Sequence, residues 1–562
     1  MLTNPFIQFI LSISLFVFRI LIPLVAIVVV WRCFTSLKKG RRREEPVIIL
    51  EDMVTHKSIP VLYWENSIGR SKSCDIVLPD VTASRDHAVL MRRESGWIVT
   101  DTGSKSGTFV NGQKAKPSLP VLAGDMISMG STALMLKSSD SFTPKKNRFF
   151  RLYQGRAASP FGLLAAVTLI QILLSAQCCF AGGNFSVLPL IPFGALFVME
   201  WGLYLFSMKG LGRVSFEVET IGFLLSGIGI LLLSGADIKT TYTQLATMAA
   251  GIVLFCILIA FMGNLDRVNK FRLAIGIAAI LLFAVNIVLG KEVNGAKNWI
   301  HIAGMSIQPS ELIKIAFIFA GAATLDKLQT AKNLTEFIIF SAICMGALFL
   351  MRDFGTAAIF FITFLLIAFM RSGSVRTVFL ACSVAVFGAF LILKFKPYVA
   401  DRFLLWGHIW DAANINDAGM QQTRVLTYAA SGGLFGLGIG NGSLKNVFAG
   451  NSDLVFGMLC EETGLVLAVV VVLTLAALIL FARSDATRSR STFYSISACA
   501  ASGMLLFQTC LNIFGATDVL PLTGVTLPFI SAGGSSMMAV WGLLAFVKAS
   551  DERTYAARRK SR

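Results

Sequence analysis

The sequence predicts a polytopic all-α membrane protein of about 13 transmembrane helices, with a small all-β domain inserted near its N-terminus. Of its 562 residues, 55% are hydrophobic and only 15% are charged, whereas soluble proteins carry roughly 25% charged residues. Apolar segments long enough to cross a bilayer recur along most of the chain. One stretch near the N-terminus differs, because short β-rich runs alternate there with turn residues and charges.

The charge pattern favours a membrane protein over a nucleic-acid binder. The formal net charge is +18, but the basic residues recur in short clusters between apolar segments, which is typical of cytoplasmic loops. We therefore expect no nucleic-acid partner. The 10 cysteines form no CxxC pair and mostly lie in apolar runs, so we interpret them as packing residues rather than metal ligands.

The N-terminal part predicts three segments. Residues 1–34 read as an uncleaved anchor, because the basic residues follow its apolar stretch instead of preceding it. Residues 45–140 are predicted to form the all-β domain, with turn signals about every ten residues. A basic linker follows over residues 141–157.

The rest of the chain predicts helices. We expect two extra transmembrane helices in residues 158–210, a core of ten in residues 211–550, and a basic tail over residues 551–562. If the β domain is cytoplasmic, the basic clusters between segments also fall inside, the N-terminus lies outside and the C-terminus lies inside. The same topology places two long polar stretches outside, at about residues 290–307 and 395–453.

Three stretches of the β domain carry a recognisable pattern. Gly69-Arg70-Ser71, Ser84-Arg85-Asp86-His87-Ala88 and the GTFVNG run from Gly107 to Gly112 occur in this order, each at the end of a predicted strand. They resemble the forkhead-associated (FHA) domain, which implies recognition of a threonine-phosphorylated protein.

The resemblance assigns the phosphopeptide site residue by residue. Arg70, Ser84 and Arg85 match the phosphate-contacting positions of the family, and Ser106 stands where an Asn usually contacts the peptide backbone. We also assign Asn111 to this site, although Asn111-Gly112 reads first as a hairpin turn. His87 is interpreted as a buried hydrogen-bonding residue rather than a ligand.

Two charged residues stand at the start of a predicted membrane helix. Glu311 and Lys314 are three residues apart, so they lie on one helix face. Charges inside a membrane helix are costly and face a polar cavity or one another. A polar cavity and a simple neutralising ion pair therefore both remain open as interpretations.

Five ordered motifs resemble the SEDS family, to which FtsW, RodA and SpoVE belong, over about residues 211–550. They are GAKNWI at 295–300 with SIQPSELIKI at 306–315, RDFGT at 352–356, SGGLFG at 431–436, DLVF at 453–456 with EETG at 461–464, and GVTLPFISAGGSS at 524–536.

This resemblance implies a peptidoglycan glycosyltransferase of the bacterial cytoplasmic membrane. The family polymerises the lipid-linked disaccharide-pentapeptide (lipid II) by inverting displacement of an undecaprenyl pyrophosphate, with a class B penicillin-binding protein as its transpeptidase partner. A divalent cation, Mg²⁺ or Mn²⁺, is a candidate partner for the pyrophosphate, and no other cofactor or protein-bound metal is expected.

The same resemblance suggests roles for individual residues. Asp453 aligns with the family's essential aspartate and is expected to be the catalytic base, although an acidic helix N-cap is the alternative. Glu311 and Lys314 are expected to act in the same cavity. The predicted substrate-binding residues are Gln308, Lys297, Trp299, Arg424 and Glu462.

Some positions depart from the family pattern. The family usually has PExHTDF before the helix that follows Asp453, and this chain has Ala449-Gly450-Asn451-Ser452 before Asp453-Leu454. These departures keep open a weakened, scaffolding member of the division or sporulation machinery. A flippase or transporter of lipid-linked precursors also stays open, because polar residues inside a helical bundle mark substrate pathways as well. Elongation, division and sporulation are not distinguished. Arg19 and Glu200, each within an apolar segment, are predicted to pair.

Overall fold

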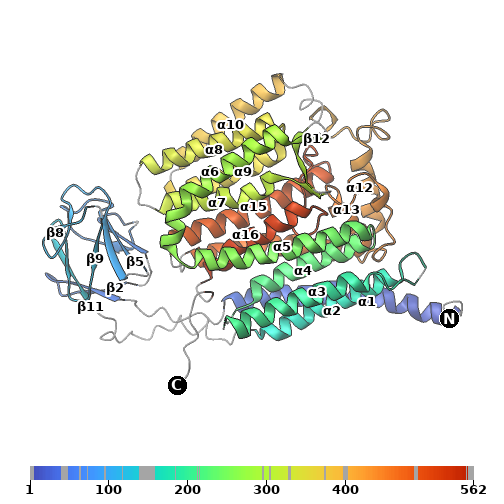
Figure 1. Cartoon of the computed structure of the whole chain (residues 1–562), viewed down its shortest axis with the longest axis horizontal. Coiled ribbons are helices and arrows are strands. Elements are labelled where there is room, and N and C mark those ends of the chain that lie inside the picture. The colour runs from blue at the N-terminus through green and yellow to red at the C-terminus, as the bar shows by residue number, and fades with distance from the viewer. Residues whose placement is uncertain are drawn as a thin grey trace.

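The computed structural model is a long helical bundle with a separate β domain at one end (Figure 1). It describes residues 5–38, 48–61, 65–72, 74–93, 96–116, 118–137, 158–183, 185–211, 213, 215–293, 296–302, 305–326, 331–372, 375–395, 403–486, 491–551 and 554. The predicted linker at 141–157 and nearly all of the tail at 551–562 lie outside these residues.

The β domain is a sandwich of two sheets, which confirms the predicted fold of this region. Its sheets have the orders β2-β1-β11-β10-β7-β8 and β4-β3-β5-β6-β9. Alternating apolar side chains such as Leu50, Leu90 and Leu134 fill the space between the sheets. The strands are β1 Ile48–Asp52, β2 Ser58–Val61, β3 Glu65–Gly69, β4 Ile76–Val77, β5 Ala88–Arg93, β6 Gly96–Asp101, β7 Thr108–Val110, β8 Gln113–Lys114, β9 Ser118–Val121, β10 Met126–Met129 and β11 Thr132–Lys137.

Three helices precede the core: α1 (Pro5–Lys38), α2 (Pro160–Cys179) and α3 (Leu190–Leu205). The predicted pairing of Arg19 with Glu200 is wrong. Arg19 Nη1 donates instead to the Gly436 carbonyl at 3.1 Å. The Glu200 carboxylate accepts hydrogen bonds from Thr168 Oγ1 at 2.5 Å and Gln171 Nε2 at 3.1 Å, both on α2.

The core helices follow the predicted apolar segments. They are α4 Glu217–Ser234, α5 Ile238–Met262, α6 Leu265–Leu289, α7 Pro309–Asp326, α8 Ala331–Leu350, α9 Phe354–Ser372, α10 Val375–Phe395, α13 Val455–Thr463, α14 Leu465–Ala486, α15 Thr492–Ala516 and α16 Gly534–Ser550. Among the described residues of the whole chain, 8 helices are long and apolar enough to cross a membrane by length and composition. The figure of about 13 crossings stays a prediction.

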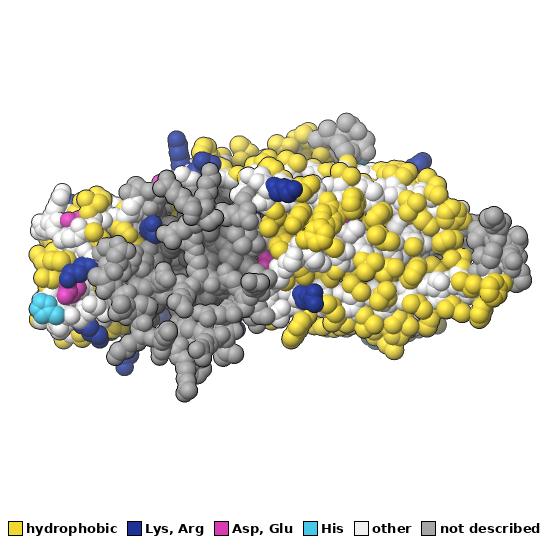
Figure 2. Space-filling model, turned by 90° about the horizontal axis from the view of Figure 1, so that it is seen from below, with side chains coloured by type: hydrophobic (Ala, Val, Ile, Leu, Met, Phe, Trp, Pro, Cys, Tyr) yellow, Lys and Arg dark blue, Asp and Glu magenta, His cyan; other side chains and the backbone are white. Residues whose placement is uncertain are grey.

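Apolar side chains cover the outside of the bundle as well as its interior. Figure 2 shows one face on which hydrophobic side chains predominate over the helical part and Lys and Arg are sparse. Exposed examples include Val253 on α5, Leu273 on α6 and Leu473 on α14. Such a surface is far more apolar than that of a soluble protein and suits a lipid environment.

Two apolar segments of the core are interrupted by non-helical residues. The apolar segment near residue 454 breaks at Gly464, whose φ of +86° is a conformation that glycine adopts without steric cost. A Cβ at this position would lie 2.4 Å from the Leu434 carbonyl oxygen. In the last segment the helix begins at Gly534, and the preceding residues 517–533 run as turns and extended chain.

The described residues of the two polar stretches lie at the end of the bundle away from the β domain (Figure 1). The stretch expected as a loop at 290–307 forms a three-stranded sheet, β12 Lys291–Val293, β13 Ala296–Ile302 and β14 Met305–Ile307. The longer stretch contains α12 (Met420–Ser431), and Trp406 Nε1 donates to the Asp518 carbonyl at 3.2 Å. We call this end of the bundle, with β12–β14, α12 and the start of α13, the distal end.

Candidate functional site

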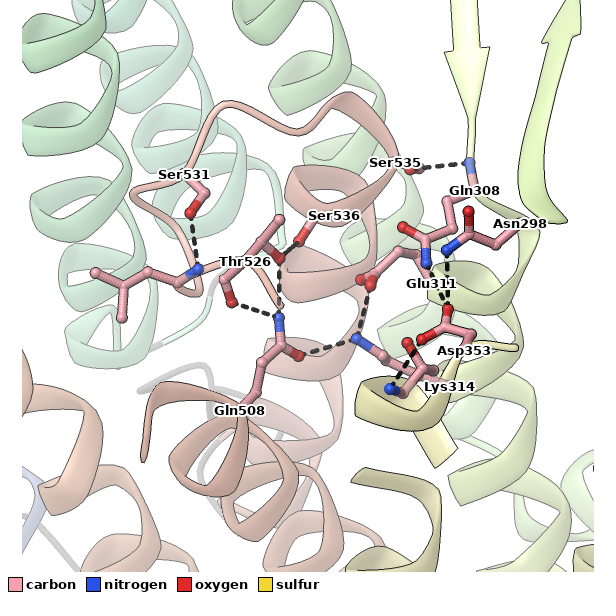
Figure 3. Close-up of polar contacts among 12 residues, drawn as sticks. Asn298, Gln308, Glu311, Lys314, Asp353, Gln508, Thr526, Ser531, Ser535 and Ser536 are labelled. Atoms are coloured by element: carbon pink, nitrogen blue, oxygen red, sulfur yellow. Dashed lines mark hydrogen bonds and ion pairs between the residues drawn. The ribbon is translucent and has the colours of Figure 1, made fainter. Parts of the chain in front are cut away.

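A buried ion pair lies at the start of α7. Lys314 Nζ is 2.7 Å from Glu311 Oε1, and it also donates to Gln508 Oε1 of α15 at 2.9 Å (Figure 3). Lys314 is 1% exposed and Glu311 is 5% exposed. Both charges therefore face each other and a glutamine rather than the open cavity that was expected, so the neutralising-pair interpretation describes their arrangement.

Gln508 joins this ion pair to the segment before α16. Its Nε2 donates to the Thr526 carbonyl at 2.9 Å and to Thr526 Oγ1 at 3.1 Å. Thr526 Oγ1 in turn lies 2.8 Å from Ser536 Oγ (Figure 3). The predicted site on α7 is thus continuous with the GVTLPFISAGGSS motif through hydrogen bonds.

Asp353 organises a second polar cluster that the sequence did not single out. Its Oδ2 accepts hydrogen bonds from Asn298 Nδ2 and Gln308 Nε2, both at 3.1 Å (Figure 3). Its Oδ1 accepts the Thr356 N–H at 3.1 Å and thereby caps α9. An acidic residue just before an apolar helix was the available signal for this role.

Asp453 lies at the distal end, just before α13, and is partly exposed. The N-cap position of α13 is occupied by Leu454, one residue after Asp453, so the acidic N-cap stays an alternative to the predicted base. The backbone around Asp453 is tied to the segment before α16. Ser531 Oγ donates to the Ser452 carbonyl at 2.6 Å, and the Ala532 N–H donates to the Asn451 carbonyl at 2.8 Å.

Two of the predicted substrate-binding residues, both cationic, also occur at the distal end. Lys297 on β13 is exposed and Arg424 on α12 is half-buried. Neither side chain forms a hydrogen bond or ion pair with another residue that the structure describes. Trp299, two residues after Lys297, is half-buried in the same strand. These side chains leave cationic and aromatic groups available for a ligand.

Glu462 is placed differently from its predicted substrate contact. Its side chain is fully buried, and its Oε2 accepts the Gly440 N–H at 2.8 Å. Glu461 accepts the N–H groups of Ser443 and Leu444 at 2.7 and 2.9 Å. Both carboxylates therefore hold the loop at 440–444, and Glu462 does not reach the surface in this arrangement.

The described residues do not fit a metal centre held by protein side chains. Among them, no three His, Cys, Asp or Glu side chains gather closely enough to bind an ion. A divalent cation bound with the pyrophosphate stays a prediction.

The FHA-like residues converge at one end of the β sandwich. The Arg70 N–H donates to the Ser84 carbonyl and the Ser71 N–H to the Arg85 carbonyl, both at 3.0 Å. Ser84 Oγ accepts the Lys105 N–H at 3.0 Å, so its own proton can be donated to a phosphate oxygen. Arg70 and Arg85 are both exposed. This arrangement offers two cations and a hydroxyl to one anion.

The two predicted peptide-contacting residues, Ser106 and Asn111, differ in their surroundings. Ser106 is exposed, and its Oγ donates to the Thr82 carbonyl at 3.4 Å. Asn111 serves the hairpin turn, because its side chain bonds Asp125 Oδ1 at 2.8 Å and the Met126 N–H at 2.9 Å. The amide group of Asn111 is thus engaged within the domain, which does not match the predicted peptide contact.

His87 is a buried core residue, as predicted, with no exposed surface. Its Nδ1 accepts the Ser84 N–H at 3.0 Å. Its Nε2 therefore carries the proton and donates to the Gly107 carbonyl at 3.2 Å. The imidazole thus links the loop that bears Ser84 to the loop that precedes β7.

Comparisons with known proteins agree with both parts of the chain. The FtsW/RodA/SpoVE family, described as cell cycle proteins, matches residues 221–555, and the FHA domain matches residues 66–130. The peptidoglycan glycosyltransferase RodA of Mycobacterium tuberculosis is 26% identical over 353 residues, which cover 58% of this chain and 75% of that protein.

Two further relatives support this assignment. The probable peptidoglycan glycosyltransferase FtsW of Bacillus subtilis is 27% identical over 375 residues, covering 59% of this chain and 90% of that protein. A chain of a peptidoglycan synthase complex has a similar fold, with a TM-score of 0.52 and 23% identity over 61% of this chain and 99% of its own length. The chain therefore belongs to the FtsW/RodA/SpoVE family and carries an FHA domain ahead of its helical core.

Proposed function

We propose that this protein is an inverting peptidoglycan glycosyltransferase that polymerises lipid II into glycan strands, with Asp453 as its base. The observation that carries this proposal is the position of Asp453. A partly exposed carboxylate is held at the distal end of the bundle, where Lys297 and Arg424 supply cations without partners among the described residues. A base and an anion-binding group are the two elements that the reaction needs.

The proposed step displaces a lipid pyrophosphate from the anomeric carbon of the donor sugar. The acceptor hydroxyl oxygen attacks that carbon from the face opposite the leaving group, and the bond from the carbon to the pyrophosphate oxygen breaks. The Asp453 carboxylate takes the hydroxyl proton, and undecaprenyl pyrophosphate leaves with the electron pair. Lys297 and Arg424 stabilise the departing negative charge.

The proposed orientation places the distal end outside the bacterial cytoplasmic membrane. The FHA domain and the C-terminus are then cytoplasmic, and the N-terminus is outside. This orientation rests on the positive-inside rule, because placing the FHA domain in the cytoplasm assigns the basic clusters between apolar segments to the same side. It brings Asp453 to the membrane face where lipid II headgroups are polymerised.

We further propose that the FHA domain regulates the enzyme by binding a threonine-phosphorylated protein, and that a class B penicillin-binding protein is the transpeptidase partner. The exposed Arg70 and Arg85 beside Ser84 support the first proposal. The similarity of the core to a chain from a peptidoglycan synthase complex supports the second.

The decisive experiment is polymerisation of labelled lipid II by the purified full-length protein, alone and with a class B penicillin-binding protein. Asp453→Ala should abolish glycan chains. Asp417→Ala, which removes an exposed carboxylate of the same polar stretch, should leave them unchanged. Product that persists in Asp453→Ala would exclude Asp453 as the base.

Binding of a phosphothreonine peptide pool, compared with the same unphosphorylated pool, tests the FHA domain separately. Arg70→Ala should weaken binding at least about tenfold, whereas Lys116→Ala, at an exposed site on the same domain, should not. Wild-type protein that binds the phosphopeptides but makes no glycan under any condition would favour the scaffold function, which the departures before Asp453 keep open.

A further inference from the structure

The strongest unassigned feature near Asp453 is an amide side chain on α15. Asn512 is 2% exposed. Its Nδ2 donates to the Asp453 carbonyl at 2.8 Å and to the Val525 carbonyl at 2.7 Å. Both partners are carbonyl oxygens, so only the NH₂ group can face them, and both of its protons are used. One side chain thus joins the backbone at Asp453 to the segment before α16.

A second amide extends this connection. Gln508 lies four residues before Asn512, so the two side chains leave the same face of α15. Gln508 binds the Thr526 carbonyl, while Asn512 binds the carbonyl of the neighbouring Val525. The other end of the Gln508 amide accepts the hydrogen bond from Lys314. Helix α15 therefore binds two successive carbonyls, and through Gln508 it also contacts the buried ion pair of α7.

The segment fixed in this way borders the Asp453 carboxylate. Gly524, immediately before Val525, has a φ of +68°, a conformation that favours glycine. A Cβ added at Gly524 would lie 3.4 Å from Asp453 Oδ2. The two hydrogen bonds that Asn512 donates thus join the backbone of Asp453 to the segment that borders its carboxylate.

The acceptor atom of Asn512 indicates that the amide does more than fill space. Asn512 Oδ1 is buried and has no hydrogen-bond partner among the described residues. Such an unsatisfied acceptor costs stability, on the order of 1–3 kcal/mol, and an apolar side chain would avoid this cost only by leaving the Asp453 and Val525 carbonyls without this donor. Clusters that tolerate such a cost are common where geometry matters for function.

We propose that Asn512 is a positioning residue for glycosyl transfer. It holds the Asp453 carboxylate next to the backbone segment Gly524–Thr526. This inference rests on the proposed function, because it takes Asp453 as the base. Asn512 itself does not contact the reacting atoms. Gln508 binds the same segment through the Thr526 carbonyl and also accepts a hydrogen bond from Lys314.

The test is steady-state polymerisation of labelled lipid II by full-length variants, normalised to folded protein. Asn512→Ala should lower kcat about tenfold or more and leave KM within about threefold. Asn512→Ser, which restores one donor, should recover part of the loss. Asn512→Asp, which places a carboxyl against two carbonyls, should not recover it.

Thr509→Val is the matched control. Thr509 is buried on the same helix, and its hydroxyl donates only to the Leu505 carbonyl of that helix. Its removal reports the effect of a buried polar change in α15 that does not touch Asp453. We expect a lower melting temperature at most, with unchanged kcat and an unchanged pH–rate profile.

A positioning role also predicts an altered pH–rate profile. If Asn512 orients the base, Asn512→Ala should shift the acidic limb of kcat, and loss of folded protein alone would not do so. An Asn512→Ala enzyme with wild-type kcat and profile would overturn this inference alone. Active Asp453→Ala protein, or wild-type protein that makes no glycan, would overturn the proposed function and the inference with it.

Discussion

The carboxylate of Glu65 in the FHA domain accepts two hydrogen bonds from Thr492, the first residue of α15. The backbone N–H of Thr492 lies 2.8 Å from Glu65 Oε2, and its Oγ1 lies 2.6 Å from the same oxygen. Because the first N–H groups of a helix have no partner within the helix, Glu65 supplies a cap from another domain. The same helix carries Gln508 and Asn512 toward its other end, so the FHA domain contacts the helix whose Asn512 binds the Asp453 carbonyl.

The first prediction is that Glu65→Ala loosens the start of α15. The change removes a hydrogen-bond acceptor and a negative charge that the helix dipole favours, worth about 0.3–1 kcal/mol. Amide hydrogen exchange at residues 491–496 of the detergent-solubilised protein should become faster. Glu65→Gln, which keeps an acceptor oxygen, should give a smaller effect.

Glu51→Gln is the control for this prediction, because Glu51 pairs with Lys137 inside the β domain and not with the core. It should leave exchange at residues 491–496 unchanged, and both variants should bind phosphothreonine peptides as the wild type does. Unchanged exchange in Glu65→Ala would mean that the two domains do not keep this contact in solution.

The second prediction concerns Asp80, which supports the loop that bears Ser84 and Arg85. Its carboxylate accepts hydrogen bonds from the N–H and hydroxyl of Thr82, and from the Ser131 N–H and Thr132 Oγ1. The Thr82 hydroxyl bond, followed by the others, holds the pKa of Asp80 far below its usual value. Its charge should therefore stabilise the folded FHA domain above the pKa of about 3.9 of an unfolded Asp.

The sign of the effect follows from this lowered pKa. The stabilisation by Asp80 is fully present above about pH 4 and is lost as the pH falls toward the pKa of the folded state. Asp80→Asn should destabilise the domain by about 1–3 kcal/mol at pH 7 and flatten the acid limb of its stability curve. Thermal melts between pH 3 and 7, followed by the fluorine NMR signal of fluorotryptophan assigned to Trp97, would check this. A variant that keeps the full acid dependence would assign that dependence to another carboxylate.

The sequence predicted those features that depend on composition and local spacing. The apolar segments became helices because hydropathy is a property of each segment by itself, and the strands of the FHA domain follow its turn signals. The spacing of Glu311 and Lys314 correctly placed them together on one helix face. The Ser84 and Arg85 loop lies beside Arg70, because these motif residues end strands on one side of a sandwich.

Contacts between distant segments could not be predicted in the same way. Asp353 meets Asn298 and Gln308 from another part of the chain, and Asn512 reaches Asp453 and Val525 through backbone carbonyls that no sequence pattern marks. The place of Glu462 within the EETG motif suggested a substrate contact, but its carboxylate binds the Gly440 N–H inside the protein. The sheet at 291–307 was missed because two of its strands have only 3 residues each, too few to show an alternating pattern.

The last prediction tests whether α1 is attached to the core by the contact of Arg19 with Gly436 or by an interaction of Arg19 with Glu200. Arg19 binds the Gly436 carbonyl, and a Cβ at Gly438 would lie 2.9 Å from Arg19 Nη2. The guanidinium therefore occupies space that glycine leaves open in this loop. Arg19→Leu should lower the melting temperature of the detergent-solubilised protein, because it leaves a carbonyl without this donor and removes a packed side chain.

A double-mutant cycle with Glu200→Gln makes the comparison quantitative. Glu200 bonds to Thr168 and Gln171, so its replacement should act independently of Arg19. The two effects on stability should then add within about 0.5 kcal/mol. If the protein with both changes were clearly more stable than the sum of the single effects predicts, Arg19 and Glu200 would interact after all. Additive losses would instead show that α1 is held by the contact of Arg19 with the glycine-rich loop at Gly436. This loop leads into residues 440–444, which the Glu461 and Glu462 carboxylates bind before the chain reaches Asp453.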